Sequence, residues 1–360
     1  MSQTKYEAVK NECRRRIDAG DWRPGEVVTS ERELSQELGV SRITVKRAFA
    51  DLIDEGLLTR VPGRRGTLVN DRTPARRRAR FIGAAIDDIR DTFGSELLRG
   101  IEDYFWDRRI HTLLCNGDRS FAKVEEYFSS LTSHEIAGVI FAPVIDHGYA
   151  RNNTRLVTFL QRHGLPFVLV DRYVPGMLAN YVAANHRESS RLIVEELLRA
   201  GHRRVLIAVG LECTSMDERV QGYRDAHEEA GVRVDESLIV RGNDSLLHPA
   251  PDGEELARFA DRVRHAGAFS CFYALNSRLL NAGIQVLREL GLEPGTKVRV
   301  ASHDEPRAGS GASGPVVPPY AVQPAYQMGW EASRILLDHI ATPRAPIVRM
   351  TLKAAVVSGA

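Results

Sequence analysis

Residues 24–69 read PGEVVTSERELSQELGVSRITVKRAFADLIDEGLLTRVPGRRGTLV, and this stretch decides the fold of the first part of the chain. Ser30 and Glu33 have the spacing of a capping box, in which each side chain satisfies a backbone N–H of the other residue, so a helix begins here. Ser41 is placed to cap another helix. That helix has one apolar face, made by Val45, Ala48, Phe49, Leu52 and Ile53. Residues 5–19 also carry apolar residues at helical spacing, so the pattern predicts three short helices.

Two short runs typical of strands, residues 57–60 and 67–69, follow the third helix and flank a tip rich in glycine and arginine. Three helices followed by a two-stranded ribbon indicate a winged helix-turn-helix, an α+β fold that binds DNA. In a helix-turn-helix the last helix buries one face and presents its N-terminal turn to the major groove.

The polar residues of that turn suit base and phosphate contacts. Arg42 can read a guanine with two hydrogen bonds, Thr44 can reach a phosphate or a thymine methyl group, and Lys46 supplies a point charge. Arg64 and Arg65 lie between glycines at the tip of the ribbon, where they can approach a phosphate backbone or a minor groove closely. The alternative is that all of these are solvated charges on a small helical domain.

This stretch resembles the DNA-binding domain of the GntR family, whose pattern runs through PG, SERELA, VSRxTVRxAL, L..EGL and a glycine-bounded wing. The resemblance covers about the first fifth of the chain. It implies DNA contacts at Arg32, Ser41, Arg42, Thr44, Lys46 and Gly66. Thr29 stands where the family usually has proline, and Lys46 where it usually has arginine. The lysine replaces a planar fork by a point charge, which favours phosphate contact over base reading.

The distribution of charge agrees with a DNA-binding head. The first 80 residues carry 18 Lys and Arg against 12 Asp and Glu, whereas the whole 360-residue chain has 49 against 47. The basic excess is therefore confined to one end, as a polyanionic partner requires. The chain starts without an apolar signal segment, has no apolar run long enough to span a membrane, and has four scattered cysteines. We therefore expect a cytoplasmic protein without a membrane partner.

Residues 70–80, NDRTPARRRAR, contain five arginines and no apolar periodicity, which indicates a linker. It could add phosphate contacts or act only as a solubilising tether, and the sequence leaves both open. We therefore expect a winged helix-turn-helix in residues 1–70, a basic linker in residues 71–80, and a two-lobed ligand-binding and dimerisation domain in residues 81–360.

From residue 81 onward, short apolar strands alternate with amphipathic helices. Strands are expected at residues 81–86, 112–115, 139–142, 167–170, 205–209, 270–273 and 297–301, and helices at residues 95–109, 186–200, 218–230, 252–266 and 276–290. This alternation predicts an α/β fold with parallel sheets covered on both faces. Its length fits two doubly wound lobes, with a ligand bound between them beyond the carboxyl ends of the strands.

Polar and aromatic residues directly follow several of these strands. They are Asp91 and Phe93 after the first strand, Asp171 and Arg172 after the fourth, Asn276 after the sixth, and Asp304 after the seventh. Carboxylate, amide and guanidinium groups can each bind neighbouring hydroxyls, and an aromatic ring can cover the apolar face of a sugar. The sequence thus predicts a sugar site at the strand ends.

Segments in the same order resemble the effector domain of the LacI/GalR family, which is itself similar to periplasmic sugar-binding proteins. They are IGAAIDDIRDTFGSELLRGIE, GLPFVLVDR, GHRRVLIAVG, ERVQGYRDAHEEAG, FYALNSRLL, VRVASHDE and VQPAYQMGWEA, which together span most of residues 81–340. The resemblance implies sugar contacts at Asp91, Phe93, Arg172, Arg219, Asn276, Asp304 and Gln323, with Asp171 adjacent.

The chain departs from that family at the expected site. The family's Asn-Pro-Phe-Phe run is replaced by residues 91–94, DTFG, which removes one aromatic wall and adds a charge. Ser277 follows Asn276 where the family has aspartate, and His303 replaces an aromatic residue. These differences bear on which ligand binds. The alternative for Asp171, Arg172 and Arg219 is that they only pair across the lobes.

Three apparent motifs do not support other chemistry. Residues 309–314, GSGASG, match a phosphate-binding pattern, but the prolines that follow cannot open a helix. His134-Glu135 lacks the second histidine of a zinc motif, and His303-Asp304 has no accompanying nucleophile. We therefore expect no catalytic residues, no metal and no cofactor.

Together these features predict a ligand-responsive transcription regulator similar to arabinose-repressor-type regulators. We expect a homodimeric repressor that a sugar or sugar derivative releases from a palindromic double-stranded operator. The alternatives are an enzyme that acts on a small carbohydrate and carries an accessory DNA-binding head, and a constitutive DNA-architectural protein that binds no ligand. The sequence does not identify the effector, the operator or the direction of regulation.

Overall fold

The computed structural model describes residues 5–54, 57–60, 66–70, 81–131, 136–243, 246, 253–306 and 319–359. The chain divides into two compact units, Met1–Arg80 and Phe81–Ala360. The predicted linker, the wing-tip residues Arg64 and Arg65, and the rejected motifs at residues 134–135 and 309–314 lie outside the described residues.

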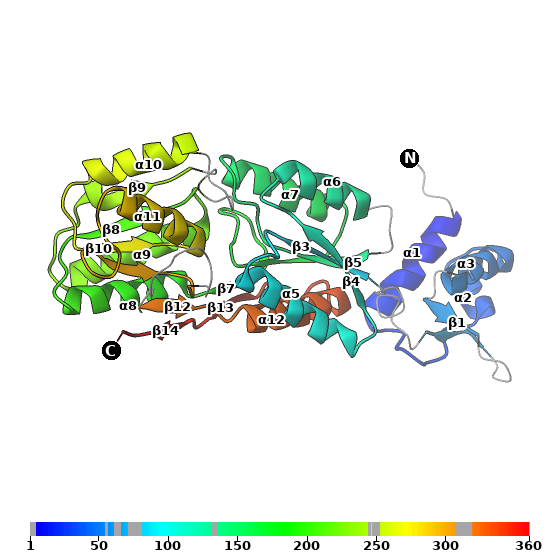
Figure 1. Ribbon diagram of the computed structural model, residues 1–360. Coiled ribbons are helices and arrows are strands. Elements are labelled where there is room, and N and C mark those ends of the chain that lie inside the picture. Colours follow the sequence, from blue (N-terminus) through cyan, green and yellow to red (C-terminus); the bar gives the residue numbers. More distant parts are fainter. Residues whose placement is uncertain are drawn as a thin grey trace. The chain divides into compact units, whose positions relative to one another are not determined.

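The first unit contains the helices and the ribbon expected from the sequence (Figure 1). The helices are α1 (Lys5–Asp18), α2 (Glu31–Glu37) and α3 (Arg42–Asp54), and the antiparallel strands are β1 (Leu58–Thr59) and β2 (Leu68–Val69). Apolar side chains from all three helices and both strands share one core, which includes Val9, Cys13, Leu34, Val45, Phe49, Leu52, Leu58 and Val69.

The capping box that fixes the start of α2 is formed as predicted. The Ser30 hydroxyl accepts a hydrogen bond from the Glu33 backbone at 3.2 Å, and the Glu33 carboxylate accepts one from the Ser30 backbone at 3.1 Å. At α3, the Thr44 backbone N–H donates to the Ser41 hydroxyl at 3.2 Å. Local hydrogen bonds thus set where both helices of the helix-turn-helix begin.

The ribbon has an additional partner that the sequence did not predict. Val27 forms a β-bridge with Leu68, and the Val28 backbone N–H donates to the Thr67 carbonyl at 2.8 Å. Gly66 enters this part of the ribbon with φ +103°, and a Cβ there would lie 2.7 Å from the Val27 side chain. Glycine is therefore required at this position for both backbone conformation and space.

The second unit begins with a lobe built on a parallel six-stranded sheet. The strand order is β4 (His111–Asn116), β3 (Phe81–Ile86), β5 (Ile136–Phe141), β6 (Phe167–Val170), β7 (Asn180–Ala184) and β13 (Arg349–Leu352). One face is covered by α5 (Thr92–Trp106) and α12 (Ala325–Ala341), and the other by α6 (Phe121–Leu131) and α7 (Tyr149–Arg162), as Figure 1 shows. We call this the first lobe.

The second lobe has the sheet order β14 (Ala355–Val357), β12 (Tyr320–Val322), β11 (Arg299–Ser302), β10 (Cys271–Ala274), β8 (Val205–Val209) and β9 (Ile239–Arg241). Its helices are α8 (His186–Arg199), α9 (Thr214–Glu229), α10 (Gly253–His265), α11 (Ser277–Glu289) and the short 3₁₀ turn η1 (Glu236–Leu238). The sheets are not wholly parallel as expected, because the edge strand β14 runs antiparallel to β12.

The chain passes between the lobes three times. It leaves the first lobe after β7 and enters α8, returns after β12 into α12, and leaves again between β13 and β14. Each passage is only a few residues long. The chain continues from β13 into β14 away from the first lobe, whereas β12 runs toward the first lobe, so β14 and β12 are antiparallel. Three short adjacent connections form a hinge about which the lobes can open and close.

Glycines let α5 and α12 approach closely on the first lobe. A Cβ on Gly100 would lie 2.0 Å from the Tyr326 carbonyl oxygen, and one on Gly329 would lie 2.2 Å from the Leu97 carbonyl oxygen. The two backbones therefore touch through a reciprocal pair of glycines. This contact fixes the first turns of α12 against the middle of α5.

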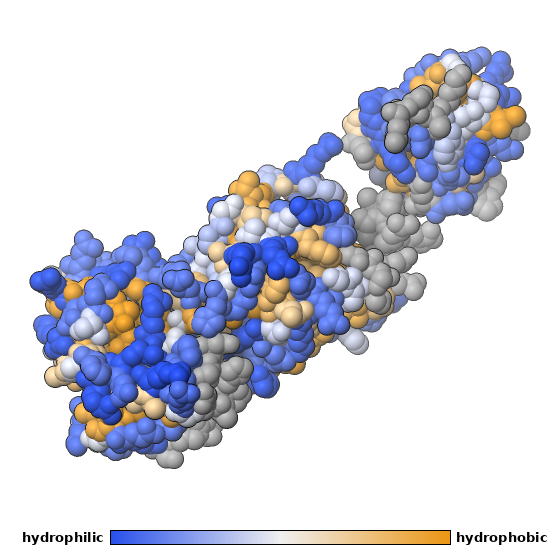
Figure 2. Space-filling view, turned by 90° about the horizontal axis from the view of Figure 1, so that it is seen from above, coloured by the Kyte–Doolittle hydropathy of each residue, from blue (hydrophilic) through white to orange (hydrophobic). Residues whose placement is uncertain are grey.

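The surface is largely hydrophilic, with scattered apolar patches on the face that Figure 2 shows. Among the described residues, no helix has both the length and the apolar character needed to cross a membrane.

Candidate DNA-binding surface and interlobe ligand site

The predicted DNA-contacting side chains of α3 lie on its exposed N-terminal turns. Arg42 and Lys46 are exposed and Thr44 is half-buried. The Thr44 and Ser41 hydroxyls lie 2.8 Å apart and hydrogen-bond to each other, which orients both side chains at the helix start. Arg32 is exposed on α2. The structure thus presents these side chains to solvent, as contact with a DNA groove requires.

Ile43 was not predicted as a contact. Among the large hydrophobic residues of the described chain, it is the most exposed. Its side chain is 80% exposed, between Arg42 and Thr44. The exposure could have been inferred from the sequence, because position 43 falls opposite the buried face formed by Val45 and Phe49.

In the second unit, a cavity of about 430 Å³ lies where the two lobes meet. Its lining includes four of the predicted ligand residues, Asp91, Phe93, Asp304 and Gln323. The first lobe contributes the start of α5 and the start of α12, and the second lobe contributes the residues after β11 and along β12. Polar and aromatic residues were selected from the sequence because they follow the ends of strands, and we call this selection the strand-end rule. Of the residues it found, Asp91, Phe93 and Asp304 meet in one cavity, although Asp304 lies more than 200 positions from the other two in the sequence.

Asp304 is held by hydrogen bonds that aim its carboxylate at this cavity. The Gln323 side-chain amide donates to Asp304 Oδ1 at 2.9 Å, and the Ser277 backbone donates to Oδ2 at 3.2 Å. Gln323 Oε1 is buried and has no hydrogen-bond partner among the described residues. A buried amide oxygen without a partner is costly, and a ligand hydroxyl or ammonium group in the cavity could satisfy it.

Asp91 both caps α5 and lines the cavity. Its Oδ1 accepts a hydrogen bond from the Gly94 backbone at 2.7 Å. Burial raises the pKa of the Asp91 carboxyl to about 6, and repulsion by Asp304 and Asp88 acts in the same direction. The ionised form of this side chain is therefore poorly compensated by the protein's own groups.

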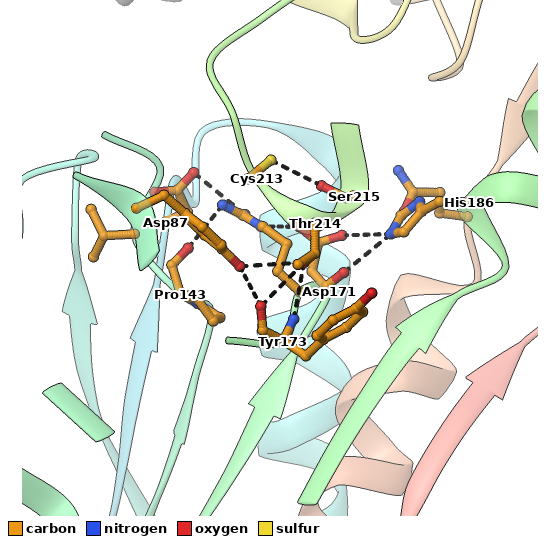
Figure 3. A network of polar contacts seen from close by, with 12 residues as sticks. Asp87, Pro143, Asp171, Tyr173, His186, Cys213, Thr214 and Ser215 are labelled. Carbon is orange, nitrogen blue, oxygen red and sulfur yellow. Dashed lines mark hydrogen bonds and ion pairs between the residues drawn. The ribbon is translucent and has the colours of Figure 1, made fainter. Parts of the chain in front are cut away.

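Asp171 lies in a buried network of polar contacts (Figure 3), to which Arg172 also belongs. Arg172 Nε is 2.6 Å from Asp171 Oδ2, and its guanidinium also donates to the Pro143 carbonyl at 2.9 Å and lies 3.6 Å from Asp87. Burial alone would raise the pKa of Asp171, but Arg172 and His186 lower it well below its usual range. Asp171 also has φ +68°, an uncommon conformation for a residue other than glycine.

Arg219 and Asn276 are engaged within the second lobe. Arg219 donates to the Leu275 carbonyl and contacts His186 at 3.2 Å, and its Nη1 is 4.0 Å from Asp304 Oδ1. Asn276 caps α11 by accepting a hydrogen bond from the Leu279 backbone at 2.8 Å. Neither residue is part of the cavity lining, although Asn276 precedes Ser277, which is.

The alternative of simple pairing across the lobes does not describe Arg172 and Arg219, because each binds partners in its own lobe. The contacts between lobes are others. Arg278 of α11 forms an ion pair with buried Asp88, which follows β3. The Thr214 hydroxyl of α9 lies 3.3 Å from the Tyr149 hydroxyl of α7 and donates to the Tyr173 carbonyl at 3.2 Å. His186 of α8 lies 3.4 Å from Asp171.

These bridging residues were missed by the sequence analysis. Asp88 follows the first strand, so the strand-end rule that selected Asp91 could have found it. Arg278 follows β10 by four residues, as the second residue of α11, so the same rule could have found it, whereas Tyr149 carries no comparable signal.

A second cavity of about 690 Å³ lies where the start of α7 faces the loops after β8 and β9. It contains none of the predicted ligand residues. Among the described parts of the chain, no group of histidine, cysteine, aspartate and glutamate side chains is arranged to hold a metal ion.

Comparisons with known proteins agree with both halves of this architecture. The family model for bacterial regulatory proteins of the gntR family matches residues 5–69, and the model for a periplasmic binding protein-like domain matches residues 194–360. The arabinose metabolism transcriptional repressor of Halalkalibacterium halodurans is 22% identical over 348 residues, which cover 95% of this chain and 91% of that protein.

Two further proteins are similar to this chain over more than two thirds of its length. The HTH-type transcriptional regulator DegA of Bacillus subtilis is 27% identical over 259 residues, which cover 72% of this chain and 73% of that protein. The solved complex of the transcriptional regulator CelR with cellobiose has a TM-score of 0.66 at 24% identity and covers 88% of this chain and 89% of that chain, which supports the fold.

The winged helix-turn-helix and these relatives define a DNA-binding transcription regulator rather than an enzyme. More particularly, the chain joins a GntR-type DNA-binding domain to a LacI-like, periplasmic-binding-protein-like effector domain, and it aligns with the arabinose metabolism repressor across both. The two resemblances drawn from the sequence are confirmed.

Proposed function

We propose that this regulator is a cytoplasmic, homodimeric repressor that binds a palindromic operator and is released from it by a sugar or sugar-like effector. The observation that carries this proposal is the cavity of about 430 Å³, whose lining is contributed by both lobes and includes Asp91, Phe93, Asp304 and Gln323. The proposed DNA contacts are those on α2, α3 and the wing, including Arg64 and Arg65.

A carbohydrate fits the chemistry of the lining. Asp91 and Asp304 offer carboxylate acceptors, Gln323 offers an unpaired amide oxygen, and Phe93 supplies an aromatic wall. Sites of this kind bind polyhydroxylated ligands through a few directed hydrogen bonds and apolar contact. Two similar proteins also point to sugars, since one is a repressor of arabinose metabolism and another was solved with cellobiose. Asp171, Arg172, Arg219 and Asn276 complete the proposed site as residues that the lobes bring against the ligand.

The position of the cavity supports regulation by lobe closure. A ligand that contacts both lobes stabilises the closed form more than the open form, and only such a difference can change affinity at a second site. Coupling of this kind is typically about 1–3 kcal/mol, or roughly 5–150-fold in operator affinity. A dimer is proposed because one winged helix reads few base pairs, whereas two related by a two-fold axis read a palindrome.

The first prediction tests this coupling with Asp304→Asn, which keeps the shape of the side chain but removes its charge. We expect ligand-free operator affinity to stay at the wild-type value, while the effector-induced fall of roughly 5–150-fold is lost, because Asp304 is replaced where the ligand binds. Operator affinity is measured by fluorescence anisotropy with and without effector. The effector is chosen by a thermal-shift screen of sugars, since binding at a hundred times Kd stabilises the fold by about 2.7 kcal/mol.

The matched control is Glu102→Gln on the exposed face of α5, which removes one charge away from the cavity. It should retain the full response. Loss of ligand-free DNA binding in Asp304→Asn would show that Asp304 supports the fold or the dimer instead of the effector site.

A further inference from the structure

The lining of the first cavity carries only negative formal charge. Its carboxyl groups are those of Asp91, Glu96, Asp304 and Glu305, and none of the described residues that line it is lysine, arginine or histidine. An anionic ligand such as a sugar phosphate or a uronic acid would meet repulsion from these carboxyl groups, and none of the described lining residues is a cation that would bind it.

The nearby cations compensate these carboxyl groups only in part. Arg219 lies 4.0 Å from Asp304 but also binds the Leu275 carbonyl and His186. Arg278 lies close enough to attract Asp91 but forms its ion pair with Asp88. Glu96 has Arg99 at 3.6 Å, on the exposed side of α5.

Asp91 is the lining carboxyl group whose ionised form is least compensated by its surroundings. Burial, then repulsion by Asp304 and Asp88, raises its pKa to about 6, and its hydrogen bond from the Gly94 backbone offsets only part of this effect. The LacI/GalR family usually has asparagine here, and asparagine could cap α5 equally well. The charge is therefore not needed for the helix.

The remaining lining offers what an amino sugar would use besides a carboxylate. Phe93, Pro324 and Tyr326 supply apolar and aromatic surface, and the buried Gln323 Oε1 can accept one further hydrogen bond. A cavity of about 430 Å³ has room for a small saccharide.

We infer that the effector is a carbohydrate that carries an ammonium group, and that Asp91 and Asp304 bind this group. The inference rests on the proposed function and specifies its ligand class. An ammonium group between the two carboxylates removes their mutual repulsion and donates up to three hydrogen bonds, one of which can reach Gln323 Oε1.

Binding of an ammonium group at Asp91 should depend on pH. Asp91 must be ionised to bind an ammonium group, and the groups that set its ionisation are Asp88, Asp304 and Arg278. Affinity for an amino sugar should therefore fall as pH drops through about 6, and binding near that pH should release a proton from Asp91. A neutral sugar that needs no ionised carboxylate should show a smaller dependence.

The test compares matched sugars on the full-length protein: glucose, galactose, xylose and cellobiose against glucosamine, galactosamine, chitosan disaccharide, glucosamine 6-phosphate and glucuronate. Thermal shift ranks them, and isothermal titration calorimetry at pH 5.5 and 7.5, in buffers of different ionisation enthalpy, measures affinity and proton release. We expect an amino sugar to bind at least about tenfold more tightly than its neutral counterpart at pH 7.5, since one unit of pKa corresponds to a tenfold change. Asp91→Asn should remove most of that preference, and Glu102→Gln should keep it.

The outcomes separate this inference from the proposed function. Preference for a neutral or acidic sugar, or an amino-sugar preference that survives Asp91→Asn, would overturn the inference and leave the sugar-responsive repressor standing. If no sugar in the panel binds, both are overturned.

The DNA-binding surface carries an exposed apolar side chain at the start of α3. Ile43 is 80% exposed in the first turn of α3, with Arg42 and Thr44 on either side. The polar neighbours suit base edges and phosphates, and the only large apolar group on a major-groove base edge is the thymine methyl. We propose that Ile43 contacts a thymine methyl group and so contributes to operator choice.

Replacing thymine by uracil removes only that methyl group, so it tests the contact directly. An operator is selected from random DNA with the wild-type protein, and each thymine of one half-site is replaced in turn. We expect one replacement to weaken binding about fourfold, as expected for the burial of one methyl-sized group. Ile43→Ser should bind the thymine and uracil forms equally at that position. Leu178→Ser, which changes an exposed leucine of the second unit, should still distinguish them. If no uracil replacement matters, or if Ile43→Ser keeps the discrimination, the proposal is wrong.

Discussion

Arg172→Leu is expected to lower the free energy of unfolding of the second unit by about 3–5 kcal/mol, the usual cost of removing one partner of a buried ion pair. The Arg172 side chain is only 5% exposed, and its guanidinium lies 2.6 Å from Asp171 and 3.6 Å from Asp87. Leucine keeps much of the apolar volume but leaves buried Asp171 without its guanidinium partner, whereas half-buried Asp87 keeps Arg119 at 3.7 Å.

Thermal unfolding of the full chain, followed by circular dichroism, measures this effect. Each kcal/mol corresponds to roughly 2–4 °C in a domain of about this size, so the transition of the second unit should fall by roughly 6–20 °C. The control is Arg155→Leu, which breaks an exposed ion pair with Glu125 and should change stability by less than about 1 kcal/mol. Equal, small changes in both variants would show that Arg172 is not needed to balance buried charge.

The effect should also depend on pH in a defined direction. In the wild type the pKa of Asp171 lies below its unfolded value, so its stabilising contribution is present above about pH 4 and is lost as pH falls through the folded pKa. Without Arg172, burial raises the pKa of Asp171 above the unfolded value, so the variant regains stability as pH falls and the group becomes protonated. The gap between wild type and variant should therefore be smaller at pH 5 than at pH 8.

This network also bears on the proposed ligand contacts of Asp171 and Arg172. The resemblance implies that both residues contact the effector, and in the structure they bind each other, Pro143 and His186. Substitution of Asp171 or Arg172 would disturb this buried network as well as any contact with the ligand. Substitution alone therefore cannot test whether either residue is a ligand contact. Asp304, which is only part-buried and lines the cavity, is the better residue for that purpose.

The DNA-binding unit was largely predictable because its signals are local. The capping box of α2, the Ser41 cap of α3 and the apolar face of α3 depend on residues three or four positions apart, and the hydrogen bonds at Ser30 and Glu33 form as the spacing indicated. The bridge from Val27 to Leu68 was not predictable in the same way, because it joins segments about 40 residues apart. The close approach of Val27 adds a steric reason for glycine at position 66 to the one that its φ of +103° provides.

In the second unit, the strand-end rule identified which edge of each sheet carries polar groups but not which groups pair there. It selected Asp91 and Asp304, and it gave no means to match Asp88 with Arg278, since that pair depends on how the lobes meet. The strand β13, RMTL, was missed because it is short and has no apolar run, and β14, AVV, because it is only three residues long. They nevertheless decide the connection between the lobes, because the third passage of the chain runs through them.

Arg42→Ala is expected to cost about 1–3 kcal/mol on the operator, or roughly 5–150-fold in affinity, and to flatten the preference at one base pair. Arg42 is exposed at the start of α3 and can form two parallel hydrogen bonds with a guanine. Lys46→Ala should instead weaken binding to operator and random DNA by similar factors and reduce the salt slope by about one, because a single phosphate contact is lost.

Titrations of both variants on operator and random DNA at several salt concentrations distinguish the two roles. The matched control is Arg47→Ala on the same helix, since the Arg47 guanidinium lies 5.2 Å from the Tyr6 ring of α1 and is directed toward the first unit's own helices. It should change operator preference little. If Arg42→Ala and Lys46→Ala lose specificity and salt dependence to the same extent, then Arg42 does not specialise in base contacts and Lys46 does not specialise in phosphate contacts. Retained preference at every base pair in Arg42→Ala would show that another side chain reads the operator.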